Sequence, residues 1–162
     1  MQVDEGSANY ITVGFGGKLV LEHGGTAIST FVCNNGSMRI EGGSANYVTV
    51  GSGGSIHLKV GGVATNVDWT PTIGEVSIQP GTVITFASSL SGVYLGDGIR
   101  QPKHSSFMKD EDIGSMTMVV MSGGTADNCS VGPSGGVSVW SGGSVSRLKV
   151  TGGELIDRKS VV

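Results

Sequence analysis

The residues that could carry acid–base or metal chemistry gather in one stretch of the chain, from residue 91 to residue 112. This stretch is rich in charge, although only 14% of all residues are charged. Its charged residues are Asp97, Arg100, Lys103, Lys109, Asp110, Glu111 and Asp112. The carboxylates at 110–112 are oxygen ligands of the kind that calcium binds, but EF-hand spacing and the GGxGxD repeat of calcium-binding β-rolls are missing. The pattern therefore favours a solvated acidic run over a calcium site.

Histidine and cysteine, the usual ligands of zinc, are scattered along the chain. They are His23, His57, His104, Cys33 and Cys129. Zinc sites use short spacings between paired ligands, and none of these residues is paired in that way. We expect no metal and no cofactor.

The sequence also contains no pattern that is typical of a hydrolase. A serine hydrolase needs a strained Gly-x-Ser-x-Gly turn with a histidine and an acid, and no serine here has that context. Glycan-cleaving β-helices need two clustered carboxylates, whereas Glu22, Asp68 and Glu75 do not recur at one repeat position. No phosphate-binding glycine loop is present. The sequence predicts a protein that is not an enzyme, with a carbohydrate-active β-helix enzyme as the alternative.

The composition limits the classes of protein and partner. Glycine supplies 29 of 162 residues, which disfavours helical bundles because each interior glycine costs about 1 kcal/mol relative to alanine. The net charge is −3 and no basic block occurs, so we expect no nucleic-acid partner. No apolar run is long enough for insertion into a membrane. Because residues 1–6 do not resemble a signal peptide, we expect a cytosolic protein or a piece of a longer exported chain.

Glycine pairs divide the chain at a regular interval, and two consecutive steps between them sum to 18 or 19 residues. The segment GSANYITVGFGG at residues 6–17 returns as GSANYVTVGSGG at residues 43–54, two such units later. Between the pairs, apolar residues alternate with polar ones, as at Leu19 and Leu21 or Met38 and Ile40. This period of two is typical of half-buried strands. Such a short unit cannot bury its apolar face alone, so we expect successive units to stack.

We therefore predict an all-β fold, a parallel β-helix (β-solenoid) with about 18–19 residues per coil. It would form a single domain over residues 1–162, with repeats at about 5–90 and 113–155 and one charged loop insertion at about 91–112. An antiparallel meander or sandwich is the alternative. In a stack with about 4.8 Å per coil, Cys33 and Cys129 would lie too far apart for a disulfide, so we expect two free thiols. Trp140 falls at an inward position, whereas Trp69 could serve the core or a sugar contact.

Three sequence segments combine the glycine pairs with the alternating apolar residues: GGTAISTFVCNNGS, EGGSANYVTVGSGGSIHL and MSGGTADNCSVGPSGGVSV. They resemble the strand-loop-strand repeats of AIDA-type, self-associating bacterial autotransporter passengers, over residues 5–85 and 113–155. The resemblance implies a right-handed parallel β-helix on or released from the bacterial cell surface, with roles in adhesion, autoaggregation and biofilm formation. It also implies O-glycosylation, for which Thr12 and Thr49 match in position. The sequence has neither the signal peptide nor the membrane barrel of that family, so we expect a fragment of a longer exported chain or a relative exported by another route.

The functional hypothesis is a secreted or surface adhesin module with a repetitive polar face. Its partners would be a second copy of itself, or surface glycans or proteins of a host or bacterium. Candidate contacts on the face are Asn9, Asn46, Asn66, Asn128, Thr12 and Thr49. Candidate contacts in the insertion are Asp97, Arg100, Lys103 and His104. The asparagines could instead form a structural hydrogen-bond ladder, and the module could instead be a purely structural stalk.

Overall fold

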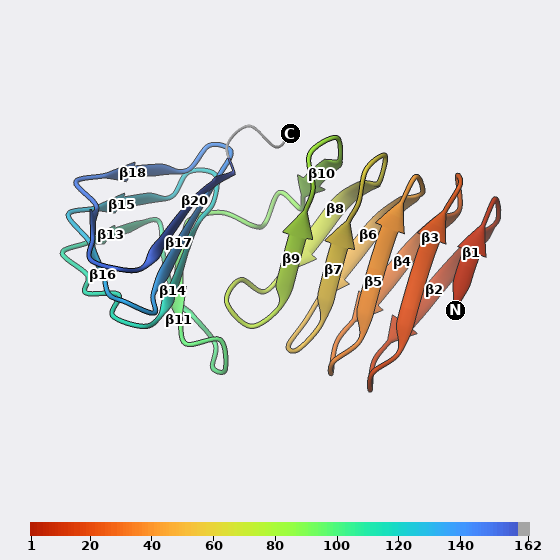
Figure 1. The fold of residues 1–162 in the computed structure, drawn as a ribbon, viewed down its shortest axis with the longest axis horizontal. Coiled ribbons are helices and arrows are strands. Elements are labelled where there is room, and N and C mark those ends of the chain that lie inside the picture. The colour runs from red at the N-terminus through yellow and green to blue at the C-terminus, as the bar shows by residue number, and fades with distance from the viewer. Residues whose placement is uncertain (159–162) are drawn as a thin grey trace. The chain divides into compact units, whose positions relative to one another are not determined.

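A computed structural model describes residues 1–158, which form strands and turns without a helix (Figure 1). The chain folds as two compact units. The first unit comprises Met1–Thr70 and Gly74–Ser89. The second comprises Pro71–Ile73 and the residues from Leu90 onward. The fold is thus all-β, and its parallel strands stack as coils of a β-solenoid, as the glycine repeat predicted.

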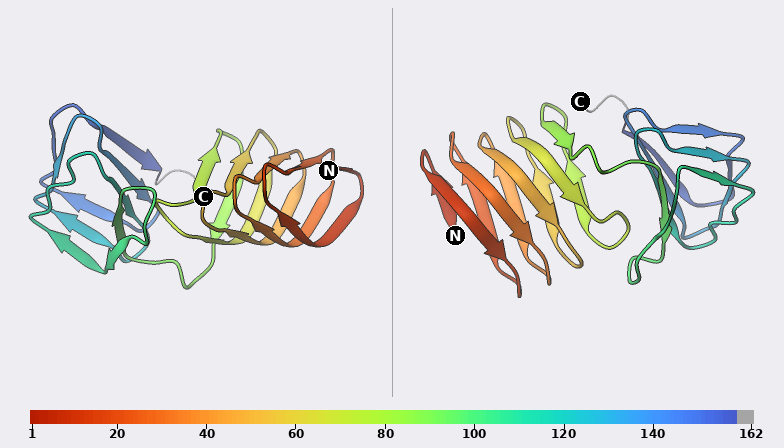
Figure 2. Two further views of the ribbon diagram at one scale, coloured as in Figure 1. Left: turned by 90° about the horizontal axis from the view of Figure 1, so that it is seen from below. Right: turned by 180° about the vertical axis from the view of Figure 1, so that it is seen from behind.

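The first unit contains ten strands in two sheets. They are β1 (Gln2–Asp4), β2 (Ser7–Val13), β3 (Lys18–Glu22), β4 (Thr26–Val32), β5 (Ser37–Glu41), β6 (Ser44–Val50), β7 (Ser55–Leu58), β8 (Val63–Trp69), β9 (Glu75–Ile78) and β10 (Val83–Phe86). Sheet A has the order β1-β3-β5-β7-β9 and sheet B the order β10-β8-β6-β4-β2. The odd-numbered strands face the viewer in Figure 1, and Figure 2 shows sheet B from behind. Every pairing in both sheets is parallel.

The register of these pairs places equivalent residues of the repeat next to one another. In sheet A, Leu19 pairs with Met38, which pairs with Ile56. In sheet B, Val13 pairs with Val32, which pairs with Val50. All six side chains are buried, so the alternating apolar residues form continuous columns inside the coil. Burial of these columns is the main force that holds the stack together.

Glycine is required where the chain turns between strands. Gly36 follows β4, and a Cβ atom built there would lie 2.1 Å from the Val13 carbonyl oxygen of the preceding coil. Only a residue without a side chain allows the backbones of two coils to approach this closely. Gly25, Gly54 and Gly62 approach a backbone carbonyl of the preceding coil in the same way, so the regular glycine pairs mark corners of the coil.

The second unit contains the other ten strands. They are β11 (Val93–Gly96), β12 (Lys103–Ser105), β13 (Phe107–Lys109), β14 (Thr117–Val120), β15 (Thr125–Asp127), β16 (Ser130–Val131), β17 (Gly136–Trp140), β18 (Ser144–Ser146), β19 (Lys149–Val150) and β20 (Glu154–Arg158). The largest sheet has the order β12-β11-β14-β17-β20, and two smaller sheets are β13-β15-β18 and β16-β19. Parallel pairing returns from β14 to β17 and from β17 to β20.

The charged segment at 91–112 differs from the loop expected from the sequence. It contains β11, β12 and β13, and β11 pairs antiparallel with both β12 and β14. The strand β13 pairs in parallel with β15, so it begins the stack of the second unit. The apolar residues Val93, Leu95 and Met108 explain this order, because all three are buried in the core of the second unit.

Both tryptophans and both cysteines are buried. Trp140 is 2% exposed, as predicted for its inward position. Trp69 is also buried, stacks on Phe86 and donates a hydrogen bond from Nε1 to the carbonyl oxygen of Gly74. It therefore belongs to the core of the first unit. Cys33 and Cys129 are free and buried, as their spacing predicted.

Candidate functional site

The outer face of sheet B carries three columns of outward residues, which together we call the sheet-B face. The first column contains Asn9, Ile28, Asn46 and Thr65, which are consecutive partners in the parallel register. The second column contains the next residue of each strand: Tyr10, Ser29, Tyr47 and Asn66. The third column contains Thr12, Phe31, Thr49 and Asp68. The repeat thus displays each type of position once per coil, about 4.8 Å from the next.

The second column exists because its residues have a left-handed backbone. The φ angle is +56° at Tyr10, +59° at Ser29 and +57° at Tyr47. A left-handed residue interrupts the alternation of a strand, so two consecutive side chains face outward before the chain returns to an inward residue. The residues of this column consequently project from the sheet, and Tyr10 is 87% exposed and Tyr47 59% exposed.

The exposed aromatic side chains are the residues that the sequence analysis missed. Tyr10 and Tyr47 occupy the same place in the two matching segments GSANYITV and GSANYVTV. Phe31 belongs to β4, the strand between those of Tyr10 and Tyr47, but it lies in the third column. It is 42% exposed. The recurring tyrosine was a signal, but its outward orientation depends on the left-handed backbone, which the alternation of polar and apolar residues does not reveal.

The four candidate asparagines do not form one column. Asn9 and Asn46 share the first column, whereas Asn66 lies in the left-handed column. Asn46 Oδ1 accepts a 2.8 Å hydrogen bond from Asn66 Nδ2 and a 3.0 Å hydrogen bond from Thr65 Oγ1. Asn128 belongs to the second unit, has a left-handed backbone, and donates from Nδ2 to Asp110 Oδ1 at 2.6 Å. Hydrogen bonds between coils thus hold Asn46, Asn66 and Asn128.

The two candidate threonines share the third column. Thr12 pairs with Phe31, and Phe31 pairs with Thr49, so the threonines lie two coils apart with an aromatic ring between them. Thr12 is exposed and Thr49 is half-buried. Both hydroxyl groups are on the sheet-B face, as their equivalent positions in the repeat indicated.

A shallow depression of about 310 Å³ lies on the sheet-B face. It is lined by Ser29, Thr30, Phe31, Tyr47 and Thr49. A second depression of about 570 Å³ lies at the corner that follows sheet B, and it is lined by Phe15, Asn34, Asn35, Ser52 and Gly53. The ring of Phe31 extends toward this corner, because a Cβ atom on Gly51 would meet its Cε2 at 3.2 Å.

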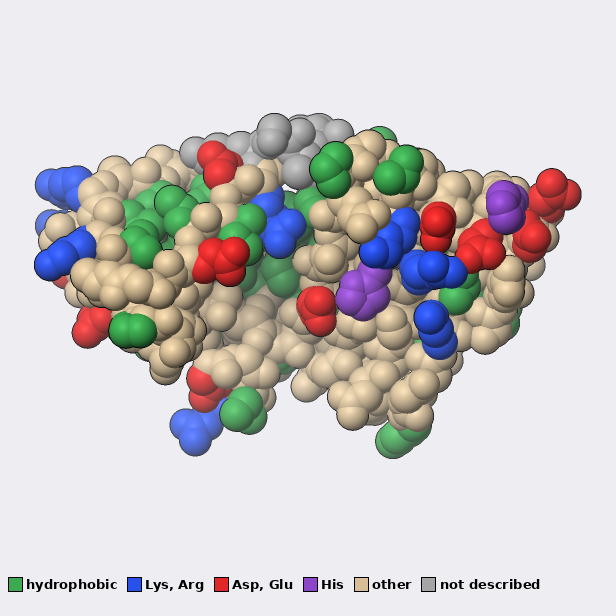
Figure 3. Space-filling view, viewed as in Figure 1, with side chains coloured by type: hydrophobic (Ala, Val, Ile, Leu, Met, Phe, Trp, Pro, Cys, Tyr) green, Lys and Arg blue, Asp and Glu red, His purple; other side chains and the backbone are tan. Residues whose placement is uncertain are grey.

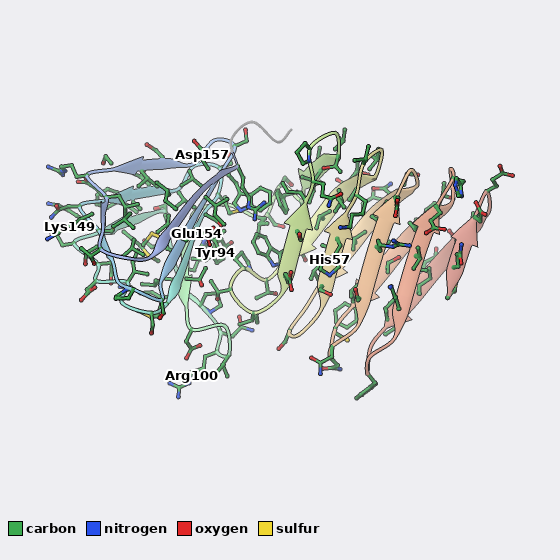
Figure 4. The ribbon with its side chains drawn as sticks, viewed as in Figure 1. His57, Tyr94, Arg100, Lys149, Glu154 and Asp157 are labelled. Carbon is green, nitrogen blue, oxygen red and sulfur yellow. The ribbon has the colours of Figure 1, made fainter. Side chains whose placement is uncertain are left out.

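The four candidate residues of the insertion are held in different ways. Asp97 Oδ1 accepts 3.0 Å hydrogen bonds from the backbone nitrogens of Ile99 and Arg100, which lower the pKa of its carboxyl group. Arg100 is exposed at the tip of the turn between β11 and β12 and points away from the sheet (Figure 4). Lys103 forms an ion pair with Glu111. The turn is thus ordered by its own contacts.

His104 is the central residue of β12. Its ring stacks on Tyr94 with centroids 4.3 Å apart, and Nε2 lies 2.8 Å from the Ser91 carbonyl oxygen. Tyr94 and His104 are partners in the antiparallel register of β11 and β12. Asp97 and Arg100 thus meet within one turn, whereas Lys103 and His104 have other partners, Glu111 and Tyr94.

Charged side chains gather on the outer face of sheet A (Figure 3). Arg39 lies at the centre, where its guanidinium contacts Glu22 at 2.6 Å and Glu41 at 3.0 Å. Gln2 donates a 2.8 Å hydrogen bond to the other oxygen of Glu22. His57 pairs with Arg39 in the register and lies on the same face (Figure 4). The charge of Arg39 is thus compensated locally by carboxylates from two strands of the sheet.

Two other kinds of site do not occur within residues 1–158. No group of three or more histidine, cysteine, aspartate or glutamate side chains there could hold a metal ion. No helix that could cross a membrane occurs in the same residues.

Comparisons with known proteins found a structural likeness. No family model matches the chain, and no curated protein matches it. A solved structure with a similar arrangement is the TibC-catalysed, hyper-glycosylated fragment of TibA. The alignment has 20% sequence identity and a TM-score of 0.40, and it covers 96% of this chain. This chain spans 56% of the length of that fragment.

Proposed function

We propose that this chain is a non-enzymatic module of an exported surface protein, and that it contacts its partners through the sheet-B face. The observation that carries the proposal is the register, which repeats the same outward positions in the four neighbouring strands β2, β4, β6 and β8. The partner would be a second copy of the chain or a surface glycan or protein. Each coil would add a weak contact, and the sum would give avidity without a single strong site.

One pair of carboxylates considered for a carbohydrate-active enzyme, Glu22 and Asp68, does not come together in the structure. Glu22 lies on the outer face of sheet A and is paired with Arg39. Asp68 lies in the third column of the sheet-B face. These two carboxylates are on opposite faces of the coil and cannot flank one glycosidic bond, which requires a separation of about 5–10 Å across a groove.

The sequence resemblance to AIDA-type passengers extends this proposal to a cellular setting. The module would act on or outside the bacterial surface as part of a longer exported chain, in adhesion, self-association or biofilm formation. Thr12 and Thr49 are our proposed acceptors for O-glycosylation, and the position of their hydroxyl groups on an outer face supports that role.

Charge substitution on the face tests the proposal. The double variant Asn9→Glu, Thr12→Glu would place two carboxylates on the sheet-B face, where both native side chains are exposed. The matched control is Gln79→Glu, Ser88→Glu, which changes two exposed residues outside the face. Sedimentation velocity and capture on immobilised bacterial surface polysaccharide would measure self-association and glycan contact.

We expect the face variant to weaken association or capture and the control variant to retain both. Equal behaviour of the two variants would contradict the proposal, and so would a wild-type chain that neither associates nor binds the polysaccharide. A purely structural stalk predicts a wild-type chain that neither associates nor binds the polysaccharide, because the function of a stalk would depend on its length alone.

A further inference from the structure

We infer that the depression between Phe31 and Tyr47 is a binding subsite for an uncharged pyranose residue of a glycan. This inference rests on the proposed function and names the ligand class for one part of the sheet-B face. The depression is formed by three successive residues of β4 and by two residues of β6. It therefore lies on two neighbouring coils of a rigid stack, not on a mobile loop.

The chemistry of the lining matches the two kinds of surface on a sugar. Phe31 and Tyr47 contribute aromatic rings that are partly exposed, and such rings can pack against the C–H face of a pyranose. Ser29 and Thr49 contribute hydroxyl groups that can donate to and accept from sugar hydroxyls. The combination of apolar walls with a few hydroxyl groups is typical of small-molecule sites.

The depression opens because the left-handed column changes from a large to a small residue. Tyr10 and Tyr47 stand two coils apart in that column, and Ser29 lies in the coil between them. The tyrosine ring of β6 thus has a short neighbour on its β4 side, which leaves room beside it. The third column alternates in the opposite order, with Phe31 between the smaller residues Thr12 and Thr49. The phenylalanine ring therefore lies at the other side of the depression.

The volume and the uncharged lining of the depression limit the kinds of ligand that it could bind. A volume of about 310 Å³ is at the lower end of the range for small-molecule sites, which suits one ring. None of its five lining residues is charged, so a phosphate or sulfate group would find no cation there. A protein partner would need about 800 Å² of complementary surface, far more than this depression offers.

The second depression extends the site for a longer glycan. It offers an aromatic ring from Phe15, which is 93% exposed, and amide groups from Asn34 and Asn35. The lining is again uncharged. The ring of Phe31 borders Gly51, and Gly51 precedes Ser52 of the second depression. A sugar chain that begins beside Tyr47 can therefore continue past Phe31 toward Phe15.

Ligand-detected NMR on the whole chain tests the inference. The probe is an equimolar mixture of the methyl pyranosides of galactose, glucose, mannose and N-acetylglucosamine, measured by saturation-transfer difference. We expect transfer to the ring C–H protons of at least one pyranoside, and an affinity loss of about tenfold in Tyr47→Ala. Tyr47→Phe keeps the ring and is expected to retain binding.

A control variant removes an exposed aromatic ring elsewhere. Phe107→Ala changes an exposed ring of the second unit, which lies outside both depressions and outside the sheet-B face. It is expected to bind like the wild-type chain. Thermal unfolding of each variant would show that the fold is intact.

Three results would overturn the inference. The first is no saturation transfer to any of the four pyranosides, and the second is an equal loss of sugar affinity in Tyr47→Ala and Phe107→Ala. The third is a loss of self-association in Tyr47→Ala when neither the wild-type chain nor any variant binds a sugar. That result would assign the sheet-B face to contact with a second copy of the chain. That third result would leave the proposed function standing, whereas the charge-variant experiment above tests the proposed function by itself.

Discussion

Asp127 at the end of β15 is the residue whose environment changes its acid–base behaviour most clearly. Arg147 donates to it from Nε at 2.8 Å, and Ser146 donates from Oγ at 2.7 Å. The hydrogen bonds from Arg147 are the largest cause that lowers the pKa of Asp127 from 3.8 to about 2. Both donors belong to the next coil, so the ionised carboxylate stabilises the stacking of β15 on β18.

This shift predicts a specific loss of stability in acid. A carboxyl group with a lowered pKa in the folded state contributes stability above its ordinary pKa of 3.8, and that contribution is lost as the pH falls toward 2. Asp127→Asn removes the titrating group. We therefore expect the melting temperature of Asp127→Asn to fall less between pH 4 and pH 2 than that of the wild-type chain. Identical pH profiles in thermal unfolding would contradict this role.

Residue types alone predicted part of the candidate site. The equivalence of Thr12 and Thr49 follows from their place in matching segments, and the register confirms it. The asparagines were harder, since the sequence grouped Asn9 with Asn66 although they occupy neighbouring columns. The left-handed backbone separates these columns, and single-residue φ angles at non-glycine positions leave little trace in the sequence.

At the scale of the element, each corner of the coil depends on close backbone contact. Gly36→Ala would place Cβ 2.1 Å from the Val13 carbonyl oxygen and 2.9 Å from the Cys33 carbonyl oxygen. The backbone has to move to relieve this overlap, and we expect a loss of about 1–3 kcal/mol in the free energy of unfolding. Urea denaturation would measure the loss.

Gly136→Ala is the matched control for this change. The nearest atom to a Cβ atom at Gly136 is the Glu154 carbonyl oxygen at 4.0 Å, which is ordinary contact. We expect its unfolding free energy to lie within about 0.5 kcal/mol of the wild-type value. A loss as large as that of Gly36→Ala would show that close approach is not the reason for glycine at the corners.

The inward columns supply the second prediction about elements. Ile56 lies in β7 between Met38 and Val76, and its side chain is fully buried. Ile56→Ala leaves a cavity in the column, so we expect it to cost about 2–5 kcal/mol in urea denaturation. Ile99 is 82% exposed, and Ile99→Ala is expected to cost less than about 0.5 kcal/mol. Similar costs would contradict the assignment of Ile56 to the core.

At the scale of the whole molecule, the glycine period and the alternation of apolar residues were sufficient to predict parallel stacking. Both are consequences of one physical requirement, since identical coils bury their apolar residues only when equivalent positions coincide. The segment 91–112 was less predictable. Its strand β11 pairs antiparallel with β12 and β14, which a repeat of parallel coils does not indicate, and its charges resemble those of a loop. The handedness of the coil stays a prediction from the family resemblance.

The sheet-B face exists only if strands β2, β4 and β6 are parallel and in the register described, and this can be measured in solution. Nuclear Overhauser contacts between backbone protons should connect Phe31 to both Thr12 and Thr49, because parallel neighbours lie about 4.8 Å apart. Close Hα–Hα contacts between residues 26–32 and 44–50, as antiparallel strands produce, would contradict the columns and the contact function built on them.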